Sequence, residues 1–344
     1  MSREPVRIGV VGAGWFASRR HLPDIGRCAG AKLAAICRRS KTELRRIAEH
    51  FGSPPAYTDY AEMLAHAELD AVLICTPHAL HGPQAAAALA RGLHVLVEKP
   101  LALSAREAAG LAEQARERSR VLAVAVNPPY WAHCHALRAW VAEGRIGDLE
   151  ASDLRWFGSV EALYGRRPLP ETMPGVVRPS LFRGNPALAG GGHLMDAGSH
   201  LVSELLWVTG RHPVAVTALM DNPENDLCAC VALQLDNNAI ATIAIRGDSR
   251  HPDRRVSSRY YGSAGMAAVD GMPFRVTLAP HGEPPTTQTE AELPPAPTPV
   301  ENFVQVIHGH AAPLAPPEHG VALAQTLEAA YESARTGRTV RLEC

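Results

Sequence analysis

The chain has 344 residues, of which 46% are hydrophobic and 20% charged, and its formal net charge is −1. This length accommodates two domains with complete hydrophobic cores, and the composition is that of a globular protein. The near-zero charge provides no basic surface for nucleic acid or an anionic membrane. No apolar run approaches the roughly 18 residues of a spanning helix, and the first strand begins too early to leave room for a signal peptide. We therefore expect a cytoplasmic protein without a metal ion.

The first element is a short apolar, β-branched run, Val6 to Val11, which predicts a strand. It leads into Gly12-Ala13-Gly14-Trp15-Phe16-Ala17, a glycine turn opening a helix. In the dinucleotide-binding fingerprint the first glycine permits the turn, the second lets the backbone approach a pyrophosphate, and the third position packs closely. We therefore expect Gly12, Gly14, Trp15, Phe16 and Ala17 to contact a dinucleotide.

The second strand, Lys32 to Cys37, ends where NAD enzymes place an acidic residue for the ribose 2′-hydroxyl. This chain has Arg38-Arg39-Ser40 there instead, with no acid in the triplet. Two guanidinium groups and a hydroxyl suit a 2′-phosphate, although a solvated basic helix start is the alternative interpretation. We therefore predict NADP as the preferred cofactor, with NAD possible.

Helices and buried strands alternate over the remainder of residues 1–126, which predicts a Rossmann domain with a doubly wound parallel sheet. The expected helices are 42–51, 58–64, 81–91 and 104–118, and the expected strands are 71–75, 93–97 and 121–126. Loops at the carboxyl ends of these strands converge on one crevice. These loops carry further candidate cofactor-binding residues, namely Thr76, Pro77, His81, Glu98 and Lys99.

Residues 127–344 predict a second, α+β domain with a largely antiparallel open sheet. The expected strands are 149–156, 214–220, 227–235, 239–246 and 255–261, and the expected helices are 131–143 and 318–333. Residues 164–186 predict a substrate loop, because they are too many for a plain connection. Residues 283–299 predict extended surface chain. One face of the sheet is expected to form the interface of a homodimer or homotetramer.

Three consecutive glycines, Gly190 to Gly192, precede an expected helix from Leu194 to Thr209 that Gly210 ends. Asp196 and His200 are four residues apart, so an α-helix would present them on one face. This pattern indicates a proton-handling pair, or alternatively a carboxylate that stabilises the helix start and a histidine inside a core.

Taken together, these motifs resemble the glucose–fructose oxidoreductase / inositol dehydrogenase / MocA family. The resemblance rests on Gly12-Ala13-Gly14, Thr76-Pro77 with His81, Glu98-Lys99-Pro100, and the Gly190 to His200 stretch. Phe182-Arg183 occupies the place of the family's aromatic–arginine pair, and Tyr331 to Val340 is similar to its closing segment.

The resemblance implies an NAD(P)-dependent oxidoreductase that acts on a hydroxyl or keto group of a sugar, polyol or cyclitol. It implies Lys99 as a catalytic residue. We assign proton transfer to His200 because histidine titrates near neutrality, with Asp196 orienting it or binding substrate. Arg183 and Asn127 complete the expected substrate-binding set. Two departures from the family pattern are Pro128, where an arginine is common after Asn127, and His78 in place of asparagine.

Two other functions are compatible with the same residues. One is the same chemistry on a dihydrodiol or a tetrapyrrole. The other is a regulator that binds the dinucleotide without turnover, as the galactose-pathway repressor of this family does. The presence of Lys99, Asp196 and His200 argues against the regulator, because a pure sensor does not need groups that handle protons.

Overall fold

A computed structural model describes residues 4–251 and 253–342, which contacts divide into two units. The first contains the described residues up to Ala125 together with Ala162–Phe182 and Pro297–Val321. The second contains Val126–Glu161, Arg183–Ala296 and the described residues from Ala322 onward. The division at Ala125 lies next to the expected boundary, but two later segments belong with the first unit rather than with residues 127–344. The expectation about a signal peptide concerns a start that lies partly outside the described residues.

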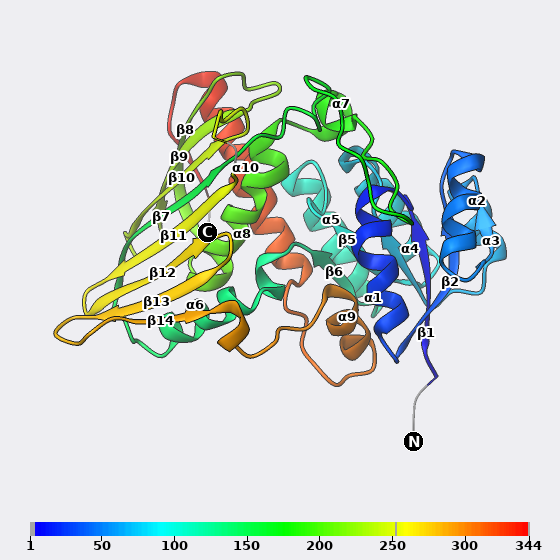
Figure 1. Cartoon of the computed structure of the whole chain (residues 1–344), viewed down its shortest axis with the longest axis horizontal. Helices are drawn as coiled ribbons and strands as arrows, with labels where there is room; N and C mark the ends of the chain where they lie inside the picture. Colours follow the sequence, from blue (N-terminus) through cyan, green and yellow to red (C-terminus); the bar gives the residue numbers. More distant parts are fainter. Residues whose placement is uncertain (1–3, 252, 343–344) are drawn as a thin grey trace. The chain divides into compact units, whose positions relative to one another are not determined.

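The first unit is built on a six-stranded parallel sheet in the order β3-β2-β1-β4-β5-β6 (Figure 1). This order confirms the predicted Rossmann sheet. The sheet forms because its apolar strands are buried between helices on both faces. The strands are β1 (Val6–Val11), β2 (Ala31–Cys37), β3 (Ala56–Tyr57), β4 (Ala71–Ile74), β5 (His94–Glu98) and β6 (Leu122–Ala125).

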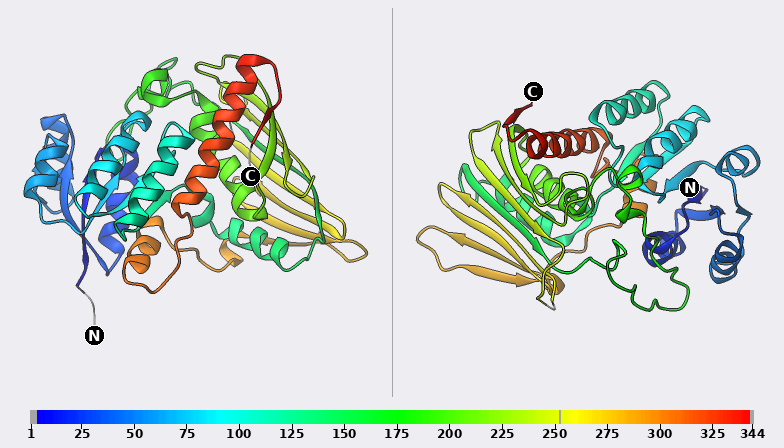
Figure 2. Two further views of the ribbon diagram at one scale, coloured as in Figure 1. Left: turned by 180° about the vertical axis from the view of Figure 1, so that it is seen from behind. Right: turned by 90° about the horizontal axis from the view of Figure 1, so that it is seen from above.

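The connecting helices begin where the sequence supplies capping side chains. Ser40, Asp59 and Ser104 each accept a hydrogen bond from a backbone N–H in the first turn of the helix that follows. The helices and short turns are η1 (Ala17–His21), α1 (Leu22–Arg27), α2 (Lys41–His50), α3 (Tyr60–His66), η2 (His78–Leu80), α4 (His81–Ala90) and α5 (Ala105–Glu117). In the view from behind, α4 and α5 cover one face of the sheet (Figure 2).

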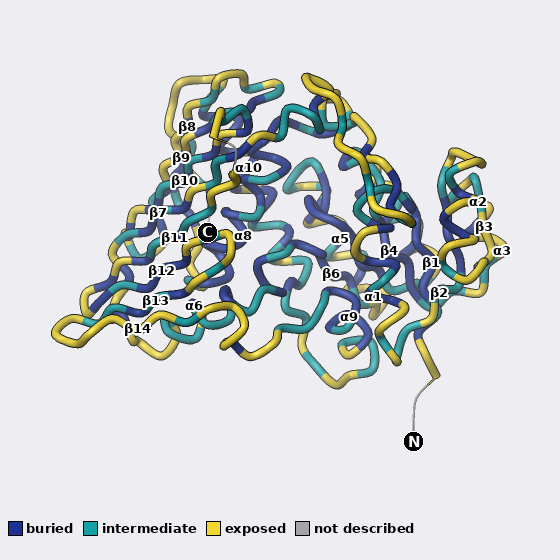
Figure 3. Tube along the Cα trace, in the orientation of Figure 1, coloured by how far each residue is buried: buried dark blue, intermediate teal, exposed yellow. Residues whose placement is uncertain are grey.

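A later helix, α9 (Pro299–Ile307), completes the core of the first unit. Its Val300, Phe303 and Val304 are buried in the same cluster as Ile8 and Leu96 of the sheet. Figure 3 shows this burial along β1 and β4, in contrast to the exposed outer surfaces of α2 and α3. The segment that contains α9 therefore belongs to the first unit because its apolar face is part of that core.

The segment Ala162–Phe182 is also anchored on the first unit. Val177 is buried in the core of that unit, and its backbone N–H donates to Ser18 Oγ over 3.0 Å. Its expected role as a substrate loop stays a prediction, but its anchor is the dinucleotide-binding unit.

The second unit contains a nine-stranded sheet in the order β14-β13-β12-β11-β7-β10-β9-β8-β15. All neighbouring pairs are antiparallel except β7 and β10, which confirms the expected largely antiparallel sheet. The strands are β7 (Leu149–Phe157), β8 (Pro213–Met220), β9 (Cys228–Leu235), β10 (Ile240–Arg246), β11 (Arg255–Gly262), β12 (Gly265–Gly271), β13 (Arg275–Pro280), β14 (Thr286–Thr289) and β15 (Val340–Arg341). The expectation of plain extended chain over residues 283–299 is wrong in part, because β14 pairs with β13 and a short turn η6 (Glu290–Glu292) follows.

Helices cover one face of this sheet, as both views in Figure 2 show. The remaining helices and turns of the chain are η3 (Pro128–Tyr130), α6 (Ala132–Ala142), η4 (Phe182–Gly184), α7 (Pro186–Ala189), η5 (Leu194–Gly198), α8 (Ser199–Thr209) and α10 (Pro317–Thr336). The expected helix from Leu194 to Thr209 therefore begins as the π-helical turn η5 and continues as α8. Gly210 ends it with a φ of +64°, a left-handed conformation that favours glycine. Within residues 4–251 and 253–342, no helix has the length and apolar character to cross a membrane.

The packing of α8 on the sheet encloses a carboxyl group, Glu204, which is 2% exposed. Its Oε1 accepts a hydrogen bond from Tyr260 Oη of β11 over 3.0 Å. Burial raises the pKa of Glu204 to about 7, because the ionised form loses its hydration.

We therefore expect Glu204 to make the protein less stable as the pH rises. A carboxyl with a raised native pKa contributes stability that is complete below its unfolded pKa and is lost as the pH rises through about 7. The loss amounts to about 3 kcal/mol at most, from about 1.36 kcal/mol per pKa unit. Urea unfolding at pH 5 and pH 8 should show a smaller pH-dependent loss for Glu204→Gln than for the unmodified protein. Equal losses in the two proteins would contradict this assignment.

Candidate functional site

The glycine turn after β1 is held between the ends of two neighbouring strands. The N–H of Gly12 donates to the carbonyl of Cys37, at the end of β2, over 3.0 Å. A Cβ at Gly12 would lie 2.6 Å from the backbone of Cys75 and Thr76, and φ at this residue is +77°. Only glycine satisfies both constraints, so the turn can follow the strand as closely as the fingerprint requires.

Arg38, at the end of β2, reaches across this turn. Its Nη1 donates to the carbonyl of Ala13 over 3.2 Å, and a Cβ at Gly14 would lie 3.2 Å from the same nitrogen. Burial lowers the pKa of Arg38. Among the described residues, the buried Nε of Arg38 has no hydrogen-bond acceptor. An anion bound beside the glycine turn would supply one, so these residues fit a dinucleotide phosphate.

Arg39 and Ser40 are the other two residues expected to bind a 2′-phosphate. Arg39 is exposed, and Ser40 Oγ accepts a hydrogen bond from the N–H of Glu43 at the start of α2. The carboxylate of Glu43 lies 3.5 Å from Arg38 Nη2. The triplet 38–40 contains no acidic residue, but Glu43 in the first turn of α2 places a carboxylate beside Arg38.

The aromatic residues of the fingerprint lie against basic side chains. The guanidinium of Arg19 is 5.6 Å from the centre of the Trp15 ring, and the Phe16 ring is 5.4 Å from that of His21. Ala17, which is fully buried, starts the π-helical turn η1. Turns of this type are rare and occur frequently at functional sites.

Lys99 follows directly after β5, and only 7% of its surface is exposed. The preceding Glu98 is also buried; its Oε1 lies 2.7 Å from His21 Nε2, and its Oε2 accepts from the N–H of Lys99 over 3.3 Å. Glu98 therefore fixes the backbone that carries the lysine.

Thr76 and Pro77 follow β4, the neighbour of β5 in the sheet. Thr76 Oγ1 donates to Gln84 Oε1 over 2.6 Å, and its carbonyl oxygen is 2.8 Å from His81 Nε2. The other ring nitrogen of His81 is 2.7 Å from the carbonyl of Pro100. The ring of His81 is fully buried and both of its nitrogens face backbone oxygens of these two loops; its contact with a cofactor stays a prediction.

In the second unit, Asp196 lies in η5 and forms an ion pair with Arg183. Arg183 Nε is 2.7 Å from Asp196 Oδ2, and both side chains are largely buried. Two predicted substrate-binding residues, Arg183 and Asp196, thus pair with each other. The π-helical turn also changes the geometry expected of Asp196 and His200, because a wider turn does not superpose residues four apart as an α-helix does.

The three glycines before η5 are required by the protein's own packing. Gly190 ends α7 with φ +75°. A Cβ at Gly191 would clash with the Tyr331 hydroxyl, and a Cβ at Gly192 would clash with the backbone of Asp226. Gly191 and Gly192 therefore allow close contact with α10 and with the segment before β9.

Asp226 and Tyr331, which sequence reasoning did not select for a role, hold this stretch in place. The buried Asp226 carboxylate accepts hydrogen bonds from Tyr331 Oη at 2.7 Å, Gly192 N at 3.1 Å and Leu194 N at 2.7 Å. The Tyr331 hydroxyl in turn accepts from the N–H groups of Gly192 and Met195. Burial raises the pKa of both Asp226 and Tyr331. The only sequence signal for Tyr331 is its place in the closing segment that is similar to the family. Asp226 is a lone acidic residue before a strand, and the sequence carries no signal for its role.

Aromatic rings lie beside His200. The Trp131 ring is 6.1 Å from the His200 ring and 6.0 Å from Phe274, all three being partly exposed. The buried His133 ring stacks on Phe274 at 4.1 Å, and burial lowers its pKa to about 4, so the ring is neutral at neutral pH. Asn127, the other predicted substrate residue, precedes η3, and its carbonyl accepts from the N–H of Tyr130.

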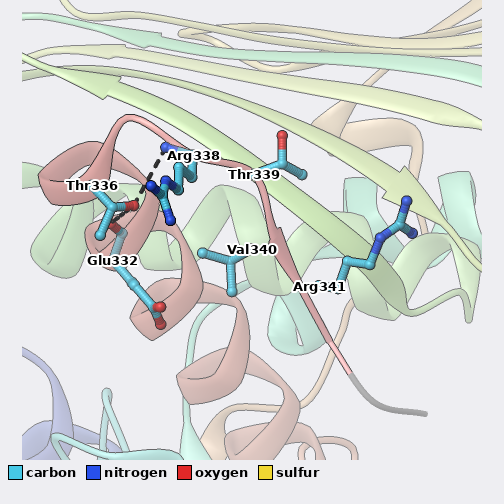
Figure 4. A pocket seen from close by; sticks show the side chains of 6 residues that line it. All are labelled: Glu332, Thr336, Arg338, Thr339, Val340 and Arg341. Atoms are coloured by element: carbon cyan, nitrogen blue, oxygen red, sulfur yellow. Dashed lines mark hydrogen bonds between the residues drawn. The ribbon is translucent and has the colours of Figure 1, made fainter.

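A surface hollow in the second unit lies away from these candidate residues in the chain. It is formed where α10 ends and β15 begins (Figure 4), and its lining residues are Glu332, Thr336, Arg338, Thr339, Val340 and Arg341. Thr336 Oγ1 donates to the carbonyl of Glu332 and accepts from the N–H of Arg338. These contacts end the helix locally, and we assign this hollow no function.

Two family models match the chain. Residues 6–126 match the oxidoreductase family with an NAD-binding Rossmann fold, and residues 134–268 match the GFO/IDH/MocA C-terminal domain. The chain belongs to the GFO/IDH/MocA family. The resemblance in the sequence motifs is thereby confirmed.

Two relatives of this chain are sugar oxidoreductases by name. The chain is 27% identical over 341 residues to D-xylose 1-dehydrogenase (NADP(+)) 2 of Haloferax volcanii, covering 97% of this chain and 99% of the relative. It is 29% identical over 210 residues to D-glucoside 3-dehydrogenase of Escherichia coli, covering 61% of this chain and 56% of the relative. The named homologues are dehydrogenases and reductases, and this chain is an enzyme of that kind.

Solved structures of this family share the fold. The aldose-aldose oxidoreductase of Caulobacter crescentus superposes with a TM-score of 0.84 at 22% identity, covering 98% of this chain and 100% of the other. The WlbA dehydrogenase of Bordetella pertussis, solved with NADH and UDP-GlcNAcA, gives 0.82 at 23% identity, covering 99% and 100%.

Tyr331→Phe should destabilise the protein by about 1–3 kcal/mol, because buried donors and an acceptor lose their partner. Hydrogen exchange of the Gly192 and Met195 amides should become faster in the variant, since both donate to this hydroxyl. Urea unfolding and exchange measured by mass spectrometry check the two effects. The control is Tyr261→Phe, which changes a tyrosine that is 42% exposed. Equal stability of the two variants would show that the Tyr331 hydroxyl does not hold this stretch.

Proposed function

We propose that this enzyme transfers a hydride between a nicotinamide cofactor, with NADP preferred, and a hydroxyl or keto group of a sugar, polyol or cyclitol. The observation that carries the proposal is the position of Lys99. It follows β5 at the carboxyl edge of the parallel sheet, the edge at which the glycine turn also lies. In such sheets ligands bind outside the carboxyl ends of the strands.

The residues proposed to hold the dinucleotide come from three strand ends. Gly12, Gly14, Trp15, Phe16 and Ala17 follow β1, Arg38, Arg39 and Ser40 follow β2, and Thr76 and Pro77 follow β4. When bound, the nicotinamide supplies the acceptor or donor of the hydride. The unsatisfied Arg38 Nε supports a phosphate nearby, and the NADP(+) in the names of the xylose dehydrogenases agrees with that choice.

The protein's own contribution to the reaction is proton transfer and charge stabilisation. The ammonium of Lys99 stabilises negative charge on the reacting oxygen. His200 takes the hydroxyl proton in oxidation and returns it in reduction. Asp196, held by Arg183, accepts a hydrogen bond from a neighbouring substrate hydroxyl, and Glu98 orients the backbone of Lys99.

The rings beside His200 support a sugar as substrate. Trp131 and Phe274 present partly exposed aromatic surface, which packs against the C–H groups on one face of a sugar ring. The ion pair of Arg183 and Asp196 supplies polar groups for hydroxyls. A mostly apolar surface with a few fixed polar groups is typical of small-molecule sites.

We further propose that the uncovered face of the nine-stranded sheet joins copies of this chain as a homodimer or homotetramer. Large apolar side chains project from this face, with Leu219 76% exposed, Ile240 50% exposed and Tyr261 42% exposed. These residues lie on β8, β10 and β11, so the apolar surface extends across the sheet. Surfaces of this kind mark interaction sites.

Lys99→Ala and His200→Ala should each lower kcat about 100- to 10,000-fold, the range expected for groups that handle protons or charge in the reaction. The assay follows nicotinamide absorbance with NADP+ and D-xylose or D-glucose, and with NADPH and 1,5-anhydro-D-fructose. Lys32→Ala, which changes an exposed lysine of β2, is the matched control. Turnover that survives either active-site substitution would remove that residue from the mechanism. Binding of NADPH without turnover of any sugar would favour the regulator.

Cofactor preference should depend on Arg38 and on its neighbour Glu43. Titration calorimetry should give tighter binding of NADPH than of NADH, and Arg38→Asp should reverse this order because it repels the 2′-phosphate. Glu43→Gln should tighten NADPH binding and leave NADH binding nearly unchanged, since it removes a negative charge 3.5 Å from Arg38. Tighter binding of NADH by the unmodified protein would overturn the assignment of Arg38.

A further inference from the structure

His81, the first residue of α4, links the segments that follow two neighbouring strands. Its side chain is fully buried. Nδ1 lies 2.7 Å from the carbonyl oxygen of Pro100, which follows β5, and Nε2 lies 2.8 Å from the carbonyl oxygen of Thr76, which follows β4. Both oxygens belong to backbone carbonyls, which can only accept hydrogen bonds.

The number of protons on this ring follows from these two contacts. A neutral imidazole carries one N–H, so in either tautomer one nitrogen would direct a lone pair at a carbonyl oxygen at hydrogen-bond distance. An imidazolium carries two N–H groups and satisfies both oxygens. We propose that His81 is held as an imidazolium and that this cation positions Lys99 by fixing the backbone on either side of the reaction site.

The groups around His81 act on its charge in both directions. Glu98, one residue from Lys99, is a buried carboxylate whose Oε1 is 2.7 Å from His21, and its field favours a cation nearby. Glu107 of α5 packs against Gly82, the residue next to His81. Desolvation of the fully buried ring is the largest effect and lowers the pKa of His81, and the Lys99 ammonium acts in the same direction. The two carbonyl oxygens and Glu98 oppose this shift. The His78 ring lies 5.7 Å from the His81 ring.

The geometry decides between these effects, because both ring nitrogens are committed to acceptors inside a fully buried site. Turning the ring over would place carbon atoms at the two oxygens and leave both unsatisfied. The imidazolium is the state in which all groups of this contact are satisfied.

The consequence for Lys99 depends on the proposed function. Pro100 directly follows Lys99, so the bond from His81 to the Pro100 carbonyl restrains the backbone that carries the lysine. Thr76 is restrained by the same ring and, through Oγ1, by Gln84 of the same helix. The first turn of α4 thus holds the ends of β4 and β5 together. His81 is a positioning residue that touches neither substrate nor cofactor.

The protonation state is tested by NMR on the full-length protein with nitrogen-15-labelled histidine. Spectra that correlate the ring nitrogens with the ring carbon protons should show, at pH 7.5, one buried histidine with both nitrogens protonated. Loss of this signal in His81→Asn assigns it, and a through-bond correlation in the unmodified protein assigns it if the variant does not fold. A His81 signal with one unprotonated nitrogen at pH 7.5 would overturn the proposal.

The positioning role is tested by kinetics with the sugars named above. His81→Asn should lower kcat about 10- to 100-fold, the cost of a small misplacement of a catalytic group, while KM for the sugar changes less than threefold. His66→Asn, which changes an exposed histidine at the end of α3, is the matched control and should retain full kcat. An unchanged kcat in folded His81→Asn would overturn the role in positioning.

The two tests separate this inference from the proposed function. The NMR measurement needs no substrate, so it decides the state of His81 even if no sugar is turned over. Absence of sugar turnover by the unmodified protein would count against the proposed function alone.

Discussion

The buried carboxylate of Asp226 is the group on which the second unit's part of the proposed site depends. A buried carboxylate without donors is unfavourable by several kcal/mol, so the three groups that donate to it are held firmly. Two of them, the N–H groups of Gly192 and Leu194, belong to the stretch that leads into η5. Asp196 lies only two residues beyond Leu194, and its position relative to the sheet is therefore set by a carboxylate that takes no part in the proposed chemistry.

The first unit uses a related device with backbone carbonyls in place of N–H groups. Gly12 is fixed because β2 and β4 end against it, and the carbonyls of Thr76 and Pro100 are fixed by one histidine ring. In both units a buried polar side chain binds the backbone of a segment and leaves that segment's own side chains available. On the proposed function, this arrangement makes the segments that carry Lys99 and Asp196 rigid, because a well-supported backbone restricts the side chains it carries.

The sequence predicts most of the first unit because its strands are buried on both faces and appear as continuous apolar runs. Strand β12 was missed because its sequence, GMAAVDG, is rich in small residues with weak strand preference and pairs through tertiary context. Helix α9 did carry a signal, the capping box formed by Thr298 and Glu301, at the end of a segment that had been interpreted as extended chain.

For the candidate site, the sequence locates the catalytic candidates but not their partners. Lys99 and Asp196 are found from their places after a strand and at a helix start. The pairing of Tyr331 with Asp226, 105 residues apart, arises from packing that no local spacing encodes. The extra width of the η5 turn likewise could not be inferred, because a four-residue spacing predicts an ordinary α-helix.

Family membership identifies the type of reaction but not the substrate. The motif residues Gly12, Gly192, His81 and Tyr331 hold backbone in place, a task that does not depend on which molecule reacts. On the proposed function, substrate choice depends on positions where this chain departs from the family pattern. After Asn127, the turn η3 begins with two prolines, so a proline stands where an arginine is common, and Trp131 follows the turn. On the proposed function, the lack of this cation weakens recognition of a charged substrate group, and the Trp131 ring beside His200 favours the C–H face of an uncharged sugar ring.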